Sequence, residues 1–374
     1  MLSWLYWNPH RELFVIPYLD RPIVWYGVFF ALGFLISYYL VLYLYREFFK
    51  NEPFFVESDI KNWSRFLMTL KNHKETTFLH NFLNSLPNPL KEKILQWDLN
   101  KEIDVRLQKA LLFGLNHYIE GSKNKKEVRL NFDHVFSCCI EKLEVKAKTL
   151  VEKQAFYMIL ATVIGARLGH ILFYEPIMEY VRDPIRIFKT WEGGLASHGA
   201  ALGIVIALVI FRLKVVKEYS KLNFQKIIDI MIIPTALVGF LIRIGNFFNQ
   251  EVLGKVSEVP WAIIFGNPAD GGRVLPRHPA QLYEAGFYFA LFFILWNLRK
   301  AKLMQVSGRL AGFGITAIFL FRFFIEFVKE EQSFYQIAWM NMGQLLSLPW
   351  IGIGISLFFA ERFFIKRSHE VISA

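Results

Sequence analysis

Long apolar runs, separated by loops that carry most of the charge, dominate the sequence. A run of about 18 to 20 apolar residues is long enough to cross the hydrocarbon core of a bilayer as a helix. Runs that approach this length have expected limits of 23–45, 155–174, 197–212, 227–248, 280–298, 310–328 and 345–361. The pattern therefore predicts an all-α integral membrane protein with seven transmembrane helices.

The loop charges predict the orientation of these spans. Lysine and arginine residues close to span ends tend to stay on the cytoplasmic side of the membrane. Basic clusters follow the first span, separate the third span from the fourth and the fifth from the sixth, and follow the seventh. All of these clusters fall on one side, which places the N-terminus outside and the C-terminus in the cytoplasm. We find no cleavable signal peptide pattern, so we expect the first span to direct insertion.

A charged stretch interrupts the series of spans after the first one. We expect an N-terminal arm with the first span, an inserted and mostly helical cytoplasmic segment, and a six-helix transmembrane core, over residues 1–49, 50–150 and 151–374. Apolar residues of the insertion recur three and four positions apart, as from Leu79 to Leu86, which is typical of amphipathic helices. The insertion carries no catalytic motif, so we expect a structural or docking role.

Composition supports a membrane protein and excludes other classes. Hydrophobic residues make up 54% and charged residues 20% of the chain, against about 25% charged in typical soluble proteins. The net charge of +11 is explained by cytoplasmic loops, and the sequence lacks patterns typical of nucleic-acid binding, so we expect no nucleic-acid partner. The two adjacent cysteines, Cys138 and Cys139, form neither a disulfide scaffold nor a metal cage. We expect no metal and no other cofactor.

The fourth span carries an arginine and an asparagine on one helix face. Arg243 and Asn246 are three residues apart near the predicted outer end of the span. An arginine in the middle of a span costs about 2.5 to 3.5 kcal/mol on insertion scales, so such a residue usually faces a partner, a polar cavity or an anionic head group. The alternative is that Arg243 extends its guanidinium to the membrane surface.

The sixth span ends with a second arginine followed by a glutamate. Arg322 and Glu326 have the i, i+4 spacing of an ion pair along one helix surface. This pair is either structural or functional. In the functional interpretation, Arg322 binds an anion such as a lipid phosphate while Glu326 holds its guanidinium in place, and Arg243 completes a phosphate clamp.

Three further spans contribute polar residues. His198 lies among glycines at the start of the third span, where it is either a satisfied core residue or a proton acceptor. Glu284 follows Gln281 at the start of the fifth span, and Tyr26 opens the first span as an interfacial anchor or as part of a polar pocket. The predicted topology places all of these residues toward the outer ends of their spans. We therefore expect one polar site in the outer half of the bilayer that binds an anionic lipid.

Several segments resemble the prolipoprotein diacylglyceryl transferase family. GFLIRIGNFFNQEVLGKV in the fourth span is similar to the family's signature, and RHPAQLYE, FRFFIEF, MGQLLS, WYG and SHGA occur in the family's order. The resemblance covers nearly all of the chain outside residues 50–150. It implies an enzyme of the bacterial inner membrane that transfers a diacylglyceryl group from phosphatidylglycerol to the lipobox cysteine thiol of a prolipoprotein, the first step of lipoprotein maturation, with release of glycerol phosphate.

The resemblance also implies roles for individual residues. It assigns catalytic roles to His198, Arg243, Arg322 and Glu326, and substrate-binding roles to Tyr26, Asn246, Glu251, Gly254 and Glu284. In the expected mechanism, the two arginines hold the phosphate leaving group, and His198 or a nearby carboxylate helps to deprotonate the thiol. The reactive cysteine belongs to the signal peptide of the prolipoprotein, so Cys138 and Cys139 are not needed.

The chain departs from the family pattern at three points. Ala200 stands where the family has the second glycine of a His-Gly-Gly segment, and Ile318 stands where the family commonly has a tyrosine. The insertion over 50–150 is not expected in the family. Two other interpretations stay open: a lipid or anion transporter that uses the same arginines, against which the lack of visible internal repeats counts, and an inactive scaffold that retains the fold.

Overall fold

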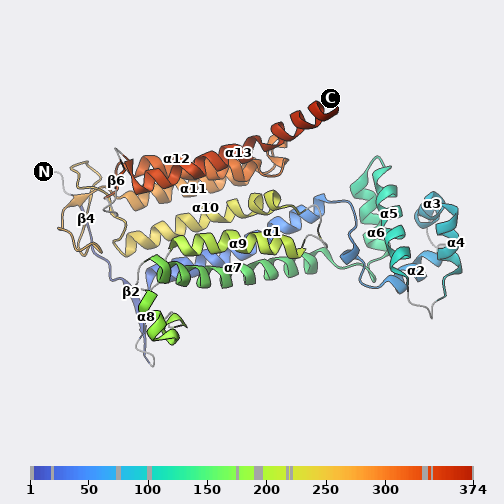
Figure 1. Cartoon of the computed structure of the whole chain (residues 1–374), viewed down its shortest axis with the longest axis horizontal. Coiled ribbons are helices and arrows are strands. Elements are labelled where there is room, and N and C mark those ends of the chain that lie inside the picture. The colour runs from blue at the N-terminus through green and yellow to red at the C-terminus, as the bar shows by residue number, and fades with distance from the viewer. Residues whose placement is uncertain are drawn as a thin grey trace. The chain divides into compact units, whose positions relative to one another are not determined.

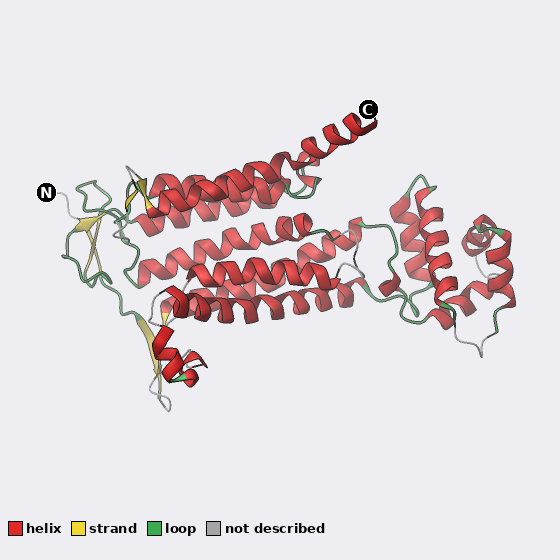
Figure 2. Ribbon diagram, in the orientation of Figure 1, coloured by secondary structure: helices red, strands yellow, loops and turns green. Residues whose placement is uncertain are grey.

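The structure, a computed structural model, describes two compact units of mostly helical chain (Figures 1 and 2). The first unit comprises residues 1–41 and 223–374, and the second unit comprises residues 42–222. The described residues are 4–17, 21–72, 77–98, 103–173, 177–188, 197–215, 219, 222–330, 336–337 and 340–372.

Long helices form the body of the first unit. They are the first part of α1 (Trp25–Asn51), α10 (Phe224–Phe248), α11 (Ala280–Leu298), α12 (Arg309–Ile325) and α13 (Met342–Ile372), with the 3-10 turn η5 (Lys302–Gln305) before α12. α10 packs against α11 and α12, and α12 packs along α13 (Figure 1). A β-carbon built on Gly312 of α12 would lie 2.6 Å from the carbonyl oxygen of Gly354 of α13. Small residues therefore allow these two helices to approach closely.

A buried carboxylate joins the start of α10 to the start of α12. Asp229 is 3% exposed, and its two oxygens accept hydrogen bonds from the backbone N–H groups of Gly308 and Ala311, both at 2.8 Å. These N–H groups belong to the first turn of α12. The N–H groups of a first turn have no carbonyl partners within the helix, and the helix dipole favours a negative charge beside them. Asp229 thus caps α12 from a neighbouring helix, and both of its oxygens are satisfied.

Short strands connect the helix ends of the first unit, so the all-α prediction is wrong in this respect. β1 (Leu5–Trp7), β4 (Ile263–Phe265) and β5 (Pro276–Arg277) form one sheet in the order β1-β4-β5, in which β1 is parallel to β4. β2 (Glu12–Ile16) pairs with β3 (Arg21–Val24), and β6 (Gln336–Ile337) pairs with β7 (Met340–Asn341). These strands are two to five residues long and partly pair across the chain, which leaves little periodic pattern in the sequence.

The second unit contains two long helices and the inserted segment. The long helices are α7 (Leu143–Phe173) and α9 (Ser197–Val215), accompanied by α8 (Ile177–Arg182) and the 3-10 turn η3 (Pro184–Phe188). Glycines bring α7 and α9 into close contact, since a β-carbon on Gly165 would lie 2.4 Å from the carbonyl oxygen of Gly199. A β-carbon on Gly203 of α9 would likewise meet the backbone of Ala161 in α7.

The inserted segment is helical, as its apolar spacing predicted. It contains the turn η1 (Glu57–Asp59) and the helices α2 (Trp63–Lys71), α3 (Thr77–Ser85), α4 (Asn88–Gln96), α5 (Val105–Glu120) and α6 (Lys125–Val135). The apolar residues from Leu79 to Leu86 are buried in its core, together with Phe66 and Phe132. Asp59, which is buried, forms ion pairs with Lys146 of α7 and, at 3.5 Å, with Arg129 of α6. The insertion is therefore a folded helical module.

Helices coincide with each of the seven predicted spans, but not all of them are long and apolar enough to cross a membrane by themselves. By length and hydropathy, four described segments qualify: Trp25–Asn51, Leu143–Leu172, Phe224–Phe248 and Met342–Ala360. α9 and α11 have 19 residues each, and α12 has 17. A helix of 17 residues spans about 26 Å, slightly less than the hydrocarbon core of a typical bilayer. The structure thus supports a multi-pass membrane protein, and the number of spans and their orientation stay predictions.

Candidate active site at the end of α10

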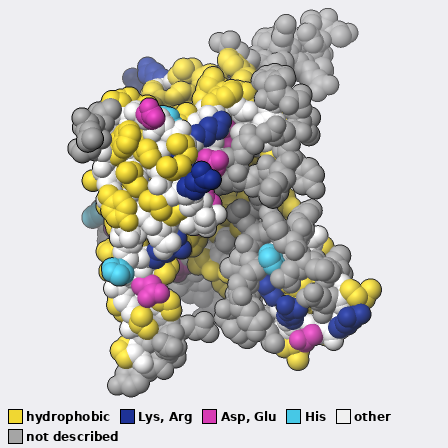
Figure 3. All heavy atoms as spheres, turned by 90° about the vertical axis from the view of Figure 1, so that its left-hand side faces the viewer, with side chains coloured by type: hydrophobic (Ala, Val, Ile, Leu, Met, Phe, Trp, Pro, Cys, Tyr) yellow, Lys and Arg dark blue, Asp and Glu magenta, His cyan; other side chains and the backbone are white. Residues whose placement is uncertain are grey.

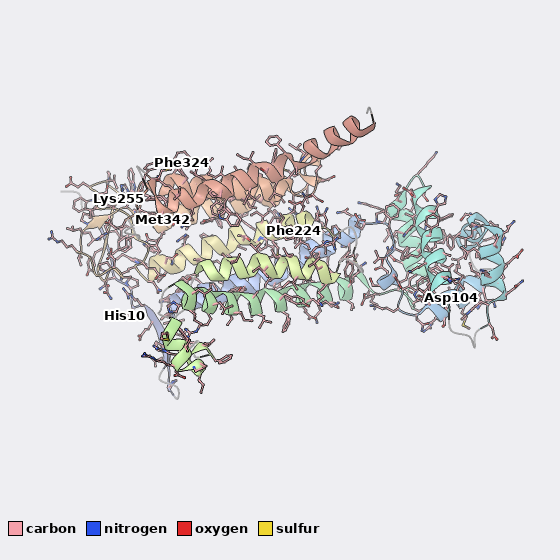
Figure 4. The ribbon with its side chains drawn as sticks, in the orientation of Figure 1. His10, Asp104, Phe224, Lys255, Phe324 and Met342 are labelled. Carbon is pink, nitrogen blue, oxygen red and sulfur yellow. The ribbon has the colours of Figure 1, made fainter. Side chains whose placement is uncertain are left out.

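Polar side chains from several helices of the first unit meet at one end of its bundle. Phe324 near the end of α12, Met342 at the start of α13 and Lys255 after α10 lie at the same end, whereas Phe224 at the start of α10 lies at the other (Figure 4). Basic and acidic side chains lie next to one another among hydrophobic ones on the face that Figure 3 shows. This is the end at which the sequence places most of the predicted site.

Arg243 and Glu284 form a buried ion pair at this end. Arg243 lies on the last turns of α10, and its Nε atom is 3.2 Å from Oε2 of Glu284 on the second turn of α11. The Glu284 side chain is 1% exposed and that of Arg243 is 14% exposed. Removing charges from water is costly unless they are paired and hydrogen-bonded. The ion pair supplies the opposite charge, but Oε2 of Glu284 accepts no hydrogen bond within the described part of the chain. The Arg243 side chain also contacts Asn246 and the hydroxyl of Tyr288 on α11.

Asn246 connects Arg243 to Glu251. Nη1 of Arg243 donates to Oδ1 of Asn246 at 3.2 Å, and Nδ2 of Asn246 donates to Oε1 of Glu251 at 2.7 Å. The spacing of three residues between Arg243 and Asn246 therefore places both side chains on one face of α10, as the sequence predicted. The other carboxylate oxygen of Glu251 accepts no hydrogen bond from any described residue.

The backbone around Glu251 is strained. Gln250 and Val252, which flank Glu251, have φ values of 54° and 58°. Left-handed backbone is rare for residues other than glycine and is a marked outlier for a β-branched residue such as Val252. Buried Gln250 helps to hold the turn, since its Oε1 accepts a hydrogen bond from the N–H of Asn267 at 2.7 Å. The turn directs Glu251 back toward Asn246.

Gly254 anchors the next segment to the end of α12. The chain at Gly254 pairs with Lys329, the N–H of Lys255 donates to the carbonyl of Val328 at 2.8 Å, and the N–H of Glu330 donates to the carbonyl of Leu253 at 2.9 Å. A β-carbon on Gly254 would lie 2.3 Å from the carbonyl oxygen of His278. Only glycine fits this position without displacing the backbone of one segment or the other.

Lys329 extends the buried ion pairs to Glu326. Its Nζ atom lies 3.2 Å from Oε1 of Glu326 and 3.7 Å from Oε1 of Glu284, and its side chain is 3% exposed. The four charges form a chain in the order Arg243, Glu284, Lys329 and Glu326. The sequence did not indicate Lys329, because it lies beyond the apolar part of the span among residues that resemble a loop.

The predicted ion pair between Arg322 and Glu326 is not formed. Glu326 instead contacts Lys329 and, at 3.4 Å, Nδ2 of Asn341. Within the described part of the chain, no carboxylate lies within 4.0 Å of the Arg322 guanidinium. The i, i+4 rule considers one helix only, and here residues that follow α12 compete for the same carboxylate.

Two tyrosines line the same region. The charges of Arg243, Glu284 and Arg322 all act on the phenol of Tyr288 on α11, so both predicted phosphate-binding arginines lie near one side chain. Tyr26 at the start of α1 is close enough to Glu251 and Arg243 for their charges to act on its phenol. Tyr26 also packs against α10, where a β-carbon on Gly245 would lie 3.1 Å from its ring. Tyr288 was not among the predicted site residues, since one aromatic residue in a span full of them gives no signal.

His198 lies in the second unit, at the start of α9, and its side chain is outside the described residues. A different histidine lies beside the site: His278 packs against Gly254, and its Nδ1 atom is 3.1 Å from the hydroxyl of Tyr283. The same hydroxyl accepts a hydrogen bond at 2.6 Å from the indole N–H of Trp261, which is largely exposed. Within the described ranges, no three His, Cys, Asp or Glu side chains are grouped as metal ligands.

The arrangement is suited to binding an anion. In the part of the chain that the structure describes, Arg322 offers a guanidinium without a bound carboxylate, and Arg243 offers donors held in place by Glu284 and Asn246. Planar guanidinium groups fit the oxygens of phosphates well. Glu251 adds a carboxylate with one oxygen to which no described residue donates, and this oxygen is able to accept a proton. The site therefore combines groups that stabilise a phosphate with a group that can act as a base.

The chain matches one protein family and many of its members. A sequence model described as prolipoprotein diacylglyceryl transferase matches residues 135–360. The phosphatidylglycerol--prolipoprotein diacylglyceryl transferase of Protochlamydia amoebophila is 37% identical over 360 residues, which cover 95% of this chain and 94% of the relative. The proteins of the same name from Tolumonas auensis and Chlamydia caviae are 41% and 40% identical, over 55% of this chain and 77% and 71% of their own lengths.

These matches differ in how much of the chain they cover, and therefore in whether they include the insertion. A match over 95% of the chain must include most of residues 50–150, so the relative from Protochlamydia amoebophila shares the insertion. The family model begins only at residue 135, and the matches to the other two relatives cover about half of the chain. One relative thus matches across the insertion, whereas the family model covers only its last residues, from 135 on.

Proposed function

This chain belongs to the prolipoprotein diacylglyceryl transferase family, and on that basis we propose that the site at the end of α10 transfers a diacylglyceryl group from phosphatidylglycerol to the lipobox cysteine of a prolipoprotein. As a member of the family, the chain is a transferase that acts in the first step of lipoprotein maturation. The observation that carries the proposal is the chain of ion pairs from Arg243 to Glu326, together with the Arg322 guanidinium, which has no carboxylate partner among the described residues.

We place the enzyme in the bacterial inner membrane as a protein of seven spans, with the N-terminus outside and the C-terminus and the insertion in the cytoplasm. The loop charges support this orientation. It puts the end of α10 that carries Arg243 toward the outer leaflet, where a secreted prolipoprotein emerges with its signal peptide still in the membrane. Both substrates then reach the site from the same side.

In the proposed reaction, Arg243 and Arg322 hold the phosphate of phosphatidylglycerol. The thiolate of the lipobox cysteine attacks the carbon of the diacylglyceryl group that bears the phosphate. A carbon–sulfur bond forms, and the bond from this carbon to the phosphate oxygen breaks. Glycerol phosphate leaves with the bonding electrons. Positive groups fixed in place before the reaction stabilise the charge that develops on this leaving group without reorganising. Glu284 and Lys329 keep Arg243 and Glu326 in position.

The thiol must lose its proton, because the thiolate is the reactive nucleophile. We propose His198 or a carboxylate as the proton acceptor. Among the carboxylates, Glu251 is best suited to accept the proton. It lies in the site, it is partly exposed, and one of its oxygens accepts no hydrogen bond from a described residue. Glu284 and Glu326 are less suited because lysine or arginine holds both of them in ion pairs. Tyr26 and Asn246 position Glu251 and contact the lipid.

The test uses purified protein in detergent with phosphatidylglycerol and a synthetic lipobox peptide. We expect the peptide to gain the mass of one diacylglyceryl group and to release one glycerol phosphate. A peptide with serine in place of the lipobox cysteine is the matched control and is expected to stay unmodified. Failure of the wild-type protein to modify the cysteine peptide, with lipid bound or transported instead, would favour the transporter interpretation and contradict the proposal.

A further inference from the structure

Glu326 is turned away from the arginine that precedes it by four residues. Its carboxylate oxygens contact Lys329 at 3.2 Å and Asn341 at 3.4 Å. On its other side the carboxylate lies against Gly343 at the start of α13, where a β-carbon would come within 2.5 Å of it. The side chain is thus held between Lys329, which lies beyond the end of α12, and the first turn of α13. Arg322, on the preceding turn of α12, has no share in this carboxylate.

The position of Lys329 is fixed by backbone contacts with the segment around Gly254. Its backbone pairs with Gly254, and hydrogen bonds on both sides join residues 328 and 330 to residues 255 and 253. Glu330 also forms an ion pair at 3.2 Å with Arg277, which is buried. The ammonium group of Lys329 therefore reaches Glu284 and Glu326 from a rigid segment, and it contacts both carboxylates at once.

We propose that Lys329 is a positioning residue that keeps Glu326 away from Arg322 and so leaves the Arg322 guanidinium open to the phosphate of the lipid substrate. This inference rests on the proposed function, since it concerns how the transferase site binds its lipid. It adds to the proposed function the consequence for Arg322: because Lys329 holds Glu326, the Arg322 guanidinium stays open to the lipid phosphate.

The physical basis is competition between two anions for one guanidinium. Glutamate and arginine four residues apart on a helix are within reach of each other, and a carboxylate fits the guanidinium fork as well as a phosphate does. Without Lys329, Glu326 would lose its closest cation while Arg322 stays one turn away. An intramolecular carboxylate on Arg322 would then have to be displaced before the lipid phosphate binds.

The first experiment replaces the ammonium by an uncharged side chain of similar length. In Lys329→Met we expect the KM for phosphatidylglycerol to rise by about tenfold, as expected when one charge-assisted contact must be exchanged for another, with a smaller effect on kcat. Lys329→Arg keeps the positive charge and is expected to stay within about threefold of wild type. Lys302→Met, at an exposed position before α12, is the matched control and should leave KM and kcat unchanged.

A double variant separates positioning from a general loss of structure. Lys329→Met/Glu326→Gln removes both the lysine and the carboxylate that would capture Arg322, so we expect it to bind phosphatidylglycerol more tightly than Lys329→Met does. Binding is measured directly in mixed micelles, so the comparison does not depend on turnover. A purely structural ion pair would recover folded yield when both partners are neutralised, but the affinity for phosphatidylglycerol per folded molecule would not recover.

The inference can still be tested if Lys329→Met alone does not fold, by comparing two double variants. Lys329→Met/Glu326→Gln and Lys329→Met/Glu284→Gln have the same net charge, and only the second keeps the carboxylate that can capture Arg322. We expect the first to bind phosphatidylglycerol about fivefold to tenfold more tightly. Equal binding by the two double variants, or an unchanged KM in a folded Lys329→Met, would overturn the inference. These outcomes presuppose an active wild-type enzyme, so failure of the proposed function is recognised separately, by the absence of peptide modification.

Discussion

Two buried charges at opposite ends of α10 differ in how completely their surroundings satisfy them. Asp229, near the start of the helix, receives hydrogen bonds from two backbone N–H groups at the first turn of α12, one on each oxygen. Arg243, near the other end, belongs to a set of charged groups in which Arg322 has no carboxylate and Glu251 keeps a free oxygen among the described residues. A buried charge with every contact filled serves the fold, whereas a set with open contacts is prepared for a ligand.

We expect the largest effect from a change in the charged groups around Arg243. Replacing Arg243 by alanine should lower the turnover of the lipobox peptide by about a hundredfold or more, because the leaving phosphate loses a fixed positive group. Turnover is measured per folded molecule by the mass increase of the peptide. Arg273→Ala, which changes an exposed arginine, is the control and should keep wild-type activity. Wild-type turnover in Arg243→Ala would remove this end of α10 from the reaction.

A substitution of Gly254 tests whether the charged groups around Arg243 depend on the segment that carries Lys329. A β-carbon here would meet the carbonyl oxygen of His278, so Gly254→Ala should shift the segment that holds Lys329. A displacement of about 1 Å in a catalytic group can cost a hundredfold in rate, and we expect a loss of about tenfold to a hundredfold. Gly286→Ala, at a helical glycine with open space around its β-carbon, should lose no activity. Similar activity in the two variants would contradict the assigned role of Gly254.

Asp229 should show the opposite behaviour. Asp229→Asn removes the charge from two hydrogen bonds to the start of α12, which we expect to lower the free energy of unfolding by about 1 to 3 kcal/mol. The melting temperature in detergent should fall, while turnover per folded molecule stays within about twofold of wild type, since the structural cap makes no contact with substrate. A large loss of turnover with unchanged melting would show that the two ends of α10 are not as different as proposed.

The chain's own thiols should matter least, because the reactive cysteine is supplied by the substrate. Cys139 is buried in the core of the insertion, and burial is the main cause that raises the pKa of its thiol to about 12, whereas Cys138 is exposed. Iodoacetamide at pH 8 should therefore label Cys138 and leave Cys139 unmodified in the folded protein. Modification of Cys138 should leave transfer activity unchanged. Loss of transfer on this modification would connect the insertion to the reaction.

The sequence predicted the helices and the meeting of the polar residues for clear physical reasons. Apolar runs of span length indicate helices directly, and alternating loop charges indicate which helix ends lie together. Arg243, Asn246, Glu284 and Tyr26 are found at one end of the first unit as expected. The energetic cost of polar groups in a span was the signal that identified them.

The rest depended on contacts between segments far apart in the sequence. Lys329 joins the site only because its segment pairs with Gly254, which lies 75 residues earlier, and no local pattern reports that pairing. The same pairing explains why the predicted contact between Arg322 and Glu326 was wrong. Asp229 was overlooked because its partners are backbone groups of another helix. β1 escaped prediction for the same reason, since it pairs with β4 across most of the chain. The other strands pair locally and are too short to give a periodic pattern.

One measurement compares the two ends of α10 directly. Wild type, Arg243→Ala and Asp229→Asn are purified in parallel, and diacylglyceryl transfer from phosphatidylglycerol to the lipobox peptide is measured per folded molecule. The account predicts that transfer falls by about a hundredfold in Arg243→Ala and stays within about twofold in Asp229→Asn. Equal losses in the two variants, or a greater loss in Asp229→Asn, would contradict the assignment of the active site to the end of α10 that carries Arg243.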